Sequence, residues 1–129
     1  MAVRYTEILE EFIRYTEILE EFIRDSGAAG AVLVSVDGLA IASVLPSSAD
    51  EDRVAAMGAA ILSLGERVTS ELNKGNLEQL YIKGSTGYVI FTGIKDVAVL
   101  GVLAPVNAKL GLLLMEIQRT IKKLEQELG

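Results

Sequence analysis

Two residue types that carry much of enzyme chemistry are missing from this chain. Its 129 residues include no cysteine and no histidine. Their absence excludes disulfides, zinc sites built on thiolates or imidazoles, and Cys–His nucleophile pairs, and it removes the commonest general base. No other cluster of residues has the spacing of a catalytic or metal site. The sequence therefore predicts a protein that is not an enzyme and that holds no cofactor and no metal.

Positive charge and long hydrophobic runs are also in short supply. Lys and Arg number 12 against 18 Asp and Glu, for a formal net charge of −6. This is the wrong sign for a protein whose affinity comes from nucleic-acid phosphates or an anionic lipid surface. The most apolar stretches, residues 97–106 and 110–115, are interrupted or too short to span a bilayer, and the N-terminus lacks a signal pattern. We expect a cytoplasmic protein with no nucleic-acid or membrane partner.

The remaining composition is that of an ordinary packed protein. Half of the residues are hydrophobic, 23% are charged and only two are proline. A chain of this length buries roughly two thirds of its unfolded surface when it folds. We therefore expect residues 1–129 to form a single domain.

A perfect tandem repeat opens the chain. The decamer RYTEILEEFI at residues 4–13 recurs letter for letter at 14–23. Its apolar residues recur at helical intervals, which predicts a helix from about residue 3 to residue 24, ended by Gly27. Ten residues fall about 80° short of three full turns, so identical residues point in different directions. One seam still crosses the junction at 3-4-3-4-3 spacing, and it consists of Tyr5, Ile8, Phe12, Tyr15, Leu19 and Phe22.

This helix is too long for the strands that follow it. About 22 helical residues span roughly 33 Å, whereas a six-residue strand spans about 20 Å. We expect the second copy to pack on the sheet and the first to project beyond it, or else to fray. A projecting copy offers an extra association surface, for a neighbouring chain or for helix exchange, made of Tyr5, Ile8, Leu9 and Phe12. The exact identity of the copies favours a recent duplication over a repeat kept for its function.

A β-hairpin and a second helix come next. Two runs rich in β-branched residues flank Asp37-Gly38, a strong hairpin signal because both central positions of a two-residue turn favour positive φ. A helix is then predicted over residues 50–74. Ser47, Ser48 or Asp50 caps its start, and Gly75 ends it.

The second helix carries two different stripes. The larger apolar residues predict the core-facing side, and they are Val54, Met57, Ile61, Leu64, Val68 and Leu72. The other stripe is made mostly of small residues, namely Ala55, Gly58, Ala59, Leu62 and Gly65. Glycine inside a helix costs roughly 1 kcal/mol relative to alanine, so a close approach by another backbone is expected there. That backbone belongs either to the sheet of the same chain or to a symmetry mate in a homodimer.

Three strands and a last helix complete the pattern. The strands are predicted at residues 77–83, 88–93 and 97–103, and the helix starts at about residue 107. The string KGSTG at 83–87 contains letters of a phosphate-binding loop, but strands flank it, so we interpret it as a turn. The order is α-β-β-α-β-β-β-α. The predicted class is α+β, with a single five-stranded antiparallel sheet, built from a hairpin and a meander, sandwiched by helices.

Four strings in this order resemble the Roadblock family, which includes roadblock-type dynein light chains and the bacterial polarity regulator MglB. The strings are AGAVLVSVDGLAIAS (29–43), VAAMGAAILSLGERV (54–68), LYIKGSTGYVIFTGIKDVAVLGVLAP (80–105) and NAKLGLLLMEI (107–117). The resemblance covers about residues 15–128. It implies a profilin-like architecture, with the first and last helices on one face of the sheet and the middle helix on the other.

The resemblance also implies a dimer and a function. Family members dimerise by pairing the middle helix and the first meander strand with their symmetry mates. On this chain the implied interface residues are Ala55, Gly58, Ala59, Leu62, Gly65, Leu77, Gln79 and Tyr81. The implied function is that of a non-enzymatic homodimeric platform that binds a small Ras-like GTPase and regulates or scaffolds it. Two alternatives remain: a small-ligand sensor domain of the profilin/PAS-like type, and a structural adaptor subunit of a motor-like complex.

Overall fold

The computed structural model describes residues 2–128, and side chains from residue 4 onward. All eight predicted elements occur in the predicted order, with ends within about three residues of the expected ones. In chain order they are α1 (Ala2–Ser26), β1 (Gly30–Ser35), β2 (Ala40–Val44), α2 (Glu51–Glu71), β3 (Gln79–Gly84), β4 (Gly87–Ile94), β5 (Ala98–Pro105) and α3 (Leu110–Leu128). The α+β class is confirmed.

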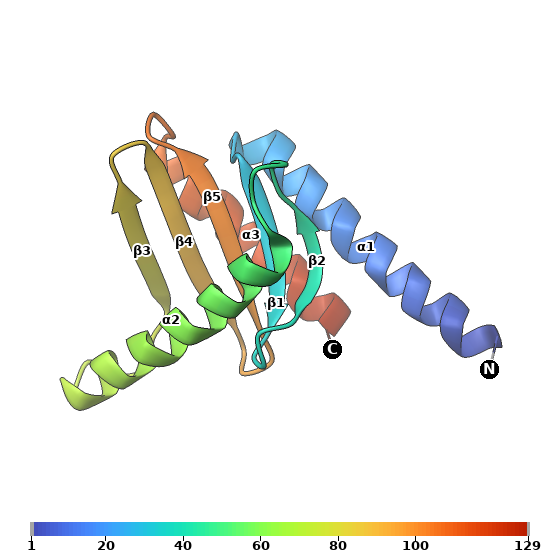
Figure 1. Ribbon diagram of the computed structural model, residues 1–129, viewed down its shortest axis with the longest axis horizontal. Helices are drawn as coiled ribbons and strands as arrows, with labels where there is room; N and C mark the ends of the chain where they lie inside the picture. The colour runs from blue at the N-terminus through green and yellow to red at the C-terminus, as the bar shows by residue number, and fades with distance from the viewer. Residues whose placement is uncertain (1, 129) are drawn as a thin grey trace.

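The five strands form one antiparallel sheet in the order β2-β1-β5-β4-β3. Helices α1 and α3 cover one face, and α2 crosses the other (Figure 1). Strands β1 and β5 lie at the centre, while β2 and β3 are the two edges. The KGSTG segment is the turn between β3 and β4, as predicted, with Gly84 paired to Gly87.

The core has two unequal halves, one on each face of the sheet. The larger half joins α1 and α3 to the sheet through side chains such as Leu19, Leu100 and Ile117, which have no exposed surface. The smaller half lies under α2 and contains Val32, Val34, Ala55, Phe91 and Val99. Central strands covered on both sides explain why β1 and β5 are apolar along nearly their whole length.

The β1–β2 hairpin forms where Asp37-Gly38 predicts it, but with a different turn. Gly38 has a φ of +88°, and no positive φ occurs at Asp37. The Ser35 amide donates to the Leu39 carbonyl at 2.8 Å, and the strand register shifts between Leu33 and Val34. The expectation of two positive φ values was wrong. A single left-handed glycine together with a bulge supplies the twist that the two-residue turn would have given.

The end of α2 also differs from the expected one. Asp50 caps the start, and its carboxylate accepts from the Arg53 amide at 3.1 Å. The helix ends at Glu71, before Gly75 is reached, because Asn73 already takes a left-handed conformation with φ +58°. The Lys74 amide then donates to the Thr69 carbonyl at 2.7 Å, which satisfies one of the last helical acceptors.

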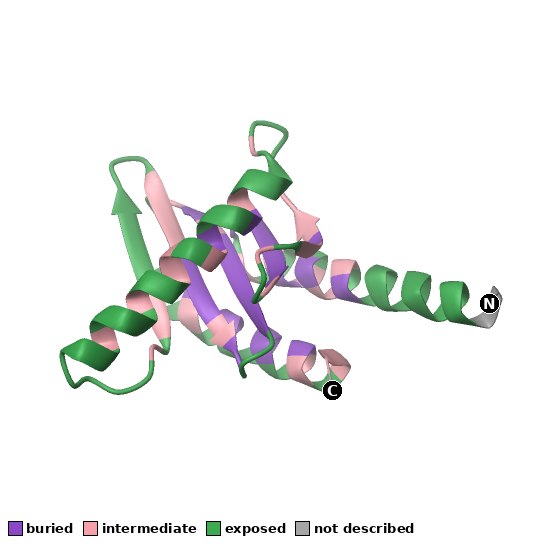
Figure 2. Cartoon of the chain, turned by 60° about the horizontal axis from the view of Figure 1, so that its bottom comes forward, coloured by how far each residue is buried: buried purple, intermediate pink, exposed green. Residues whose placement is uncertain are grey.

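The two identical copies in α1 have opposite environments. In the second copy Tyr15, Leu19 and Phe22 are 6%, 0% and 2% exposed. The first copy continues the same helix past the sheet, and its side chains are exposed (Figure 2). The prediction that the second copy packs and the first projects is confirmed.

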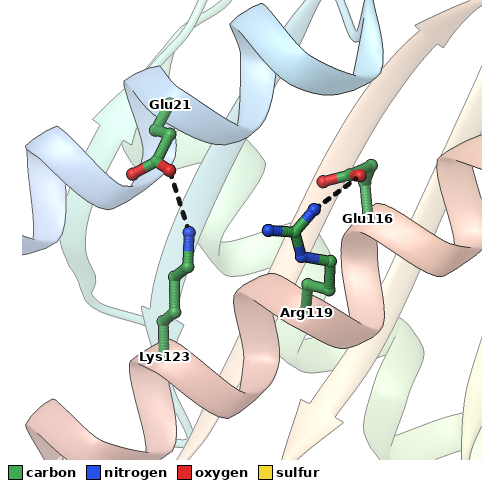
Figure 3. Close-up of polar contacts among 4 residues, drawn as sticks. All are labelled: Glu21, Glu116, Arg119 and Lys123. Carbon is green, nitrogen blue, oxygen red and sulfur yellow. Dashed lines mark hydrogen bonds and ion pairs between the residues drawn. The ribbon is translucent and has the colours of Figure 1, made fainter.

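Ion pairs fix the second copy against α3. Lys123 Nζ donates to Glu21 Oε1 at 3.0 Å (Figure 3), and Arg14 donates to Glu127 at 2.8 Å. The hydrogen bond from Lys123, and secondly its charge, lower the pKa of Glu21 below its ordinary value. Figure 3 also shows the ion pair between Arg119 and Glu116, at 3.3 Å. It gives the mostly buried Glu116 carboxylate a partner on its own helix.

The duplication provides a matched pair of leucines for a stability test. We expect Leu19→Ala to lower the free energy of unfolding by about 2–5 kcal/mol, because it opens a cavity in the core. Leu9→Ala, the same change in the exposed copy, is expected to alter it by no more than about 0.5 kcal/mol. Urea denaturation measures both. Equal losses would show that both copies contribute to the core.

The lowered pKa of Glu21 gives a pH-dependent prediction. A carboxyl whose pKa falls on folding stabilises the native state above its unfolded pKa, and this contribution disappears as the pH falls through the folded pKa. Glu21→Gln is therefore expected to lower the melting temperature near pH 7 and to leave it unchanged near pH 3. Glu11→Gln, in the exposed copy, is the control. A Glu21→Gln deficit of the same size at both pH values would contradict the role of the ion pair.

Candidate interaction surface

Helix α2 rests on the sheet through its stripe of small residues. Ala55 has no exposed surface, and Gly58 is buried. A Cβ on Gly58 would lie 2.8 Å from Cε1 of Phe91, and a Cβ on Gly65 would lie 2.8 Å from Cδ2 of Leu77. Only glycine fits at these two contacts without displacing a neighbour. The close approach that the stripe predicts is thus made within one chain, to its own sheet.

The larger apolar residues of α2 consequently face outward. Met57, Leu64, Val68 and Leu72 are between 48% and 65% exposed. Val54 and Ile61 are half-buried and pack at the margin of the α2 contact with the sheet. The prediction that these six residues form the core face was wrong for Met57, Leu64, Val68 and Leu72, whereas Val54 and Ile61 do pack against the smaller core. The sheet presents bulky side chains at this face, such as Phe91, and they leave room only for the small stripe.

Strand β3 is an edge strand with its outer side unpaired. It is the last strand in the sheet order, and its side chains from Tyr81 onward are exposed. It lies at the opposite side of the sheet from α1 (Figure 1). Tyr81 and Ile82 expose 45% and 37% of their surface. A free row of backbone donors and acceptors with apolar side chains beside it is suited to pairing with another strand.

An apolar groove joins the outward face of α2 to β3. Its lining comes from the second half of α2, from the loop before β3 and from β3 itself. The lining residues are Ile61, Leu64, Gly65, Val68, Thr69, Leu77 and Leu80. We call the outward residues of α2, this groove and the free edge of β3 the α2/β3 surface. The lining of its groove is almost entirely apolar, and exposed apolar patches often mark protein interfaces.

The structure sorts the interface residues that the resemblance implied. Ala55 and Gly58 are turned into the chain's own core, so they support the position of α2 and do not face outward. Of the others, Gly65 and Leu77 line the groove, and Tyr81 is exposed on β3. Ala59, Leu62 and Gln79 are half-buried and line a more polar hollow around the turn between β4 and β5. Sequence reasoning missed Met57, Leu64, Val68 and Leu80 as surface residues. The signal was present, since two stripes on one helix cannot both face a single sheet.

A second hollow lies around the turn between β4 and β5. Residues of α2, α3 and the ends of the outer strands line it, and most of the lining is polar. The Oγ1 atom of Thr92, at its margin, is buried without a hydrogen-bond partner among the described residues. The hollow is only partly enclosed, whereas small-ligand sites bury most of the surface of their ligand.

Comparison with known proteins places the chain in a family. Residues 14–104 match the family model of the Roadblock/LC7 domain. The chain belongs to the Roadblock/LC7 family. The protein MJ1340 of Methanocaldococcus jannaschii is 35% identical over 99 residues, which cover 77% of this chain and 86% of the relative. The family match begins at residue 14, the first residue of the second copy, so the first copy lies outside it.

Solved structures confirm the fold of this Roadblock protein. MglB of Myxococcus xanthus superposes with a TM-score of 0.85 at 19% identity, over 91% of this chain and 89% of MglB. An MglB structure described as having a tetrameric arrangement gives 0.82 at 21% identity, over 91% and 89%. Profilin IA of Acanthamoeba castellanii gives 0.63 at 13% identity, over 89% and 99%. The predicted Roadblock and profilin-like architecture is therefore confirmed.

Across residues 2–128, no helix combines the length and the hydropathy needed to cross a membrane. The same residues contain no group of three or more acidic side chains placed to hold a metal ion.

The seating of α2 can be tested with two glycines. Gly58→Ala is expected to lower the free energy of unfolding by about 1 kcal/mol, because overpacking against the buried Phe91 ring outweighs alanine's helix propensity. Gly111→Ala is the control, since a Cβ there meets nothing within 4 Å. It is expected to be neutral or to stabilise by up to about 1 kcal/mol. Thermal or urea denaturation compares them, and an equal gain at both sites would contradict the close contact.

Proposed function

We propose that this Roadblock protein is a non-enzymatic, cytoplasmic homodimer that binds a small Ras-like GTPase and regulates or scaffolds it. The observation that carries the proposal is the α2/β3 surface, an exposed apolar helix face joined to an unpaired sheet edge. The family membership supports the same assignment.

A symmetry mate is the partner that fits both parts of the surface at once. A twofold axis beside β3 would pair Gln79–Gly84 with itself in antiparallel register, extending the sheet across both chains. The same axis would bring the two α2 helices together through Leu64 and Val68, which are 60% and 48% exposed in one chain. Antiparallel helices also place opposite macrodipole ends side by side. The small stripe contributes indirectly, by turning these larger residues outward.

The GTPase assignment follows from the resemblance to family members that act on small GTPases, among which MglB is a regulator. The chain has no cysteine or histidine to supply acid–base chemistry. An effect on the nucleotide cycle would therefore come from contacts that favour one arrangement of the GTPase's own switch loops. A GTPase that is bound without any change in its cycle would make this chain a scaffold.

The dimer is tested by a charge on the outward face of α2. Leu64→Glu is expected to convert the dimer to a monomer in light scattering, because pairing would bury the new carboxylate. Ser70→Glu places the same group about 120° around the helix and is the control, expected to remain dimeric. Circular dichroism establishes that both variants are folded. A monomeric wild-type chain at all concentrations would refute the dimer.

The GTPase is tested with small Ras-like GTPases encoded near this gene, each loaded with GDP or with a non-hydrolysable GTP analogue. We expect binding that depends on the nucleotide, and hydrolysis rates then separate regulation from scaffolding. Absence of binding to every such GTPase, with the dimer intact, would refute the function while leaving the dimer established.

A further inference from the structure

The first copy of the repeat carries exposed apolar residues outside the α2/β3 surface. Five of its ten side chains are large and hydrophobic, and each exposes at least half of its surface. They are Tyr5 65%, Ile8 56%, Leu9 60%, Phe12 50% and Ile13 53%. At 100° per residue they occupy one arc of about 140° on the helix. Three of the five, Tyr5, Ile8 and Phe12, continue the seam through which Tyr15, Leu19 and Phe22 enter the core, and Leu9 and Ile13 stand beside it.

We propose that residues 4–13 form a second self-association surface, which pairs antiparallel with residues 4–13 of another copy of this chain. The occupant of the arc is thus the same arc on a second molecule. Its packing would be that of a short coiled coil, with Tyr5, Ile8 and Phe12 at the seam positions.

The charges beside the arc favour the antiparallel orientation. Arg4 and Glu11 are seven residues apart, so they lie on the same flank of the helix. In an antiparallel pair like flanks meet, and Arg4 of each chain lies beside Glu11 of the other, giving two complementary contacts related by the twofold axis. In a parallel pair this flank meets the opposite flank, where Leu9 stands, and neither charge gains a partner. The helix macrodipoles also oppose parallel pairing.

The position of the first copy keeps this contact separate from the α2/β3 surface. The first copy projects past the β2 side of the sheet, whereas β3 is the opposite edge (Figure 1). The two surfaces can therefore be occupied at the same time. Residues 4–13 also lie outside the family match, which starts at residue 14, so this contact is an addition to the Roadblock domain.

Its size indicates a weak contact by itself. Five side chains that are already partly covered by their own helix expose at most about 600 Å² per chain, below the roughly 800 Å² per partner of a standard interface. The contact gains strength when two arcs are presented on one particle, because the second pairing is then intramolecular. Only this gain in strength depends on the proposed α2/β3 dimer. The expected product is a tetramer or an open chain of dimers that accumulates as concentration rises.

Light scattering over a wide concentration range tests the pairing in the full-length chain. The wild type is expected to assemble beyond the dimer, and Ile8→Gln is expected to weaken this step at least about tenfold. Glu10→Gln introduces the same side chain away from the arc and is expected to leave the step unchanged. Deleting residues 4–13 should abolish it while the fold is retained, since the second copy makes the core contacts. Identical mass distributions for the wild type and the deletion would refute the proposal.

Charge exchange tests the orientation. Arg4→Glu and Glu11→Arg are each expected to weaken assembly several-fold, and the double variant is expected to restore it. A double variant that stays as weak as the single ones would refute the antiparallel arrangement. Mixing of two labelled preparations should be complete within seconds to minutes, as for a surface contact. If the labelled chains mixed only after unfolding, this would show helix exchange and would also refute the antiparallel surface contact.

The outcome is distinguishable from failure of the proposed function. In a Leu64→Glu background the α2/β3 dimer is removed, and a weak dimer that disappears with Ile8→Gln is still expected. Its absence at millimolar concentration, together with an unaltered wild-type dimer, would refute the second surface alone.

Discussion

The contact between Phe91 and Gly58 determines which side of α2 packs on the sheet and which side faces solvent. The ring is held in the smaller core, and a Cβ at Gly58 or at Gly101 would come within 3.0 Å of it. Helix α2 can approach the sheet only with its small stripe inward, so Met57, Leu64, Val68 and Leu72 must face solvent. The exposed apolar face of α2 is thus a consequence of tight packing on the opposite side of the same helix.

On the other face the decisive constraint is length. Helix α1 has 25 residues, whereas β1 and β2 beneath it have six and five. Only about half of such a helix can lie over the sheet. Chain connectivity selects the second copy for that half, because both copies have the same sequence and only the second is joined directly to β1. The ion pairs of Glu21 and Arg14 with α3 then help to hold it there.

The sequence predicted the element order, the sheet and the fates of the two copies, because each depends on local periodicity and on element length. It mispredicted the rotation of α2, because the stripes of Val54 and of Ala55 both satisfy helical periodicity. The choice between them is made by Phe91 and Leu77, which are distant in sequence. The prediction of the hairpin turn failed for a related reason, since the bulge after Leu33 depends on strand pairing and not on Asp37-Gly38 alone. The interface residues that the resemblance implied include Ala55 and Gly58, which pack inward on the chain's own sheet.

The two apolar surfaces differ in their relation to the family fold. The α2/β3 surface arises from the packing of the family fold, whereas the first-copy arc lies on residues 4–13, outside the family match. Because the repeat length leaves the copies about 80° apart, the seam uses Ile8 in the first copy but Leu19, the counterpart of Leu9, in the second, while Tyr5 and Phe12 are the counterparts of Tyr15 and Phe22. A second copy of a core-facing helical segment that extends past the sheet exposes an apolar arc. Two twofold contacts in one chain give either a closed tetramer or an open fibre. The net charge of −6 opposes the open form, since each added dimer brings further negative charge.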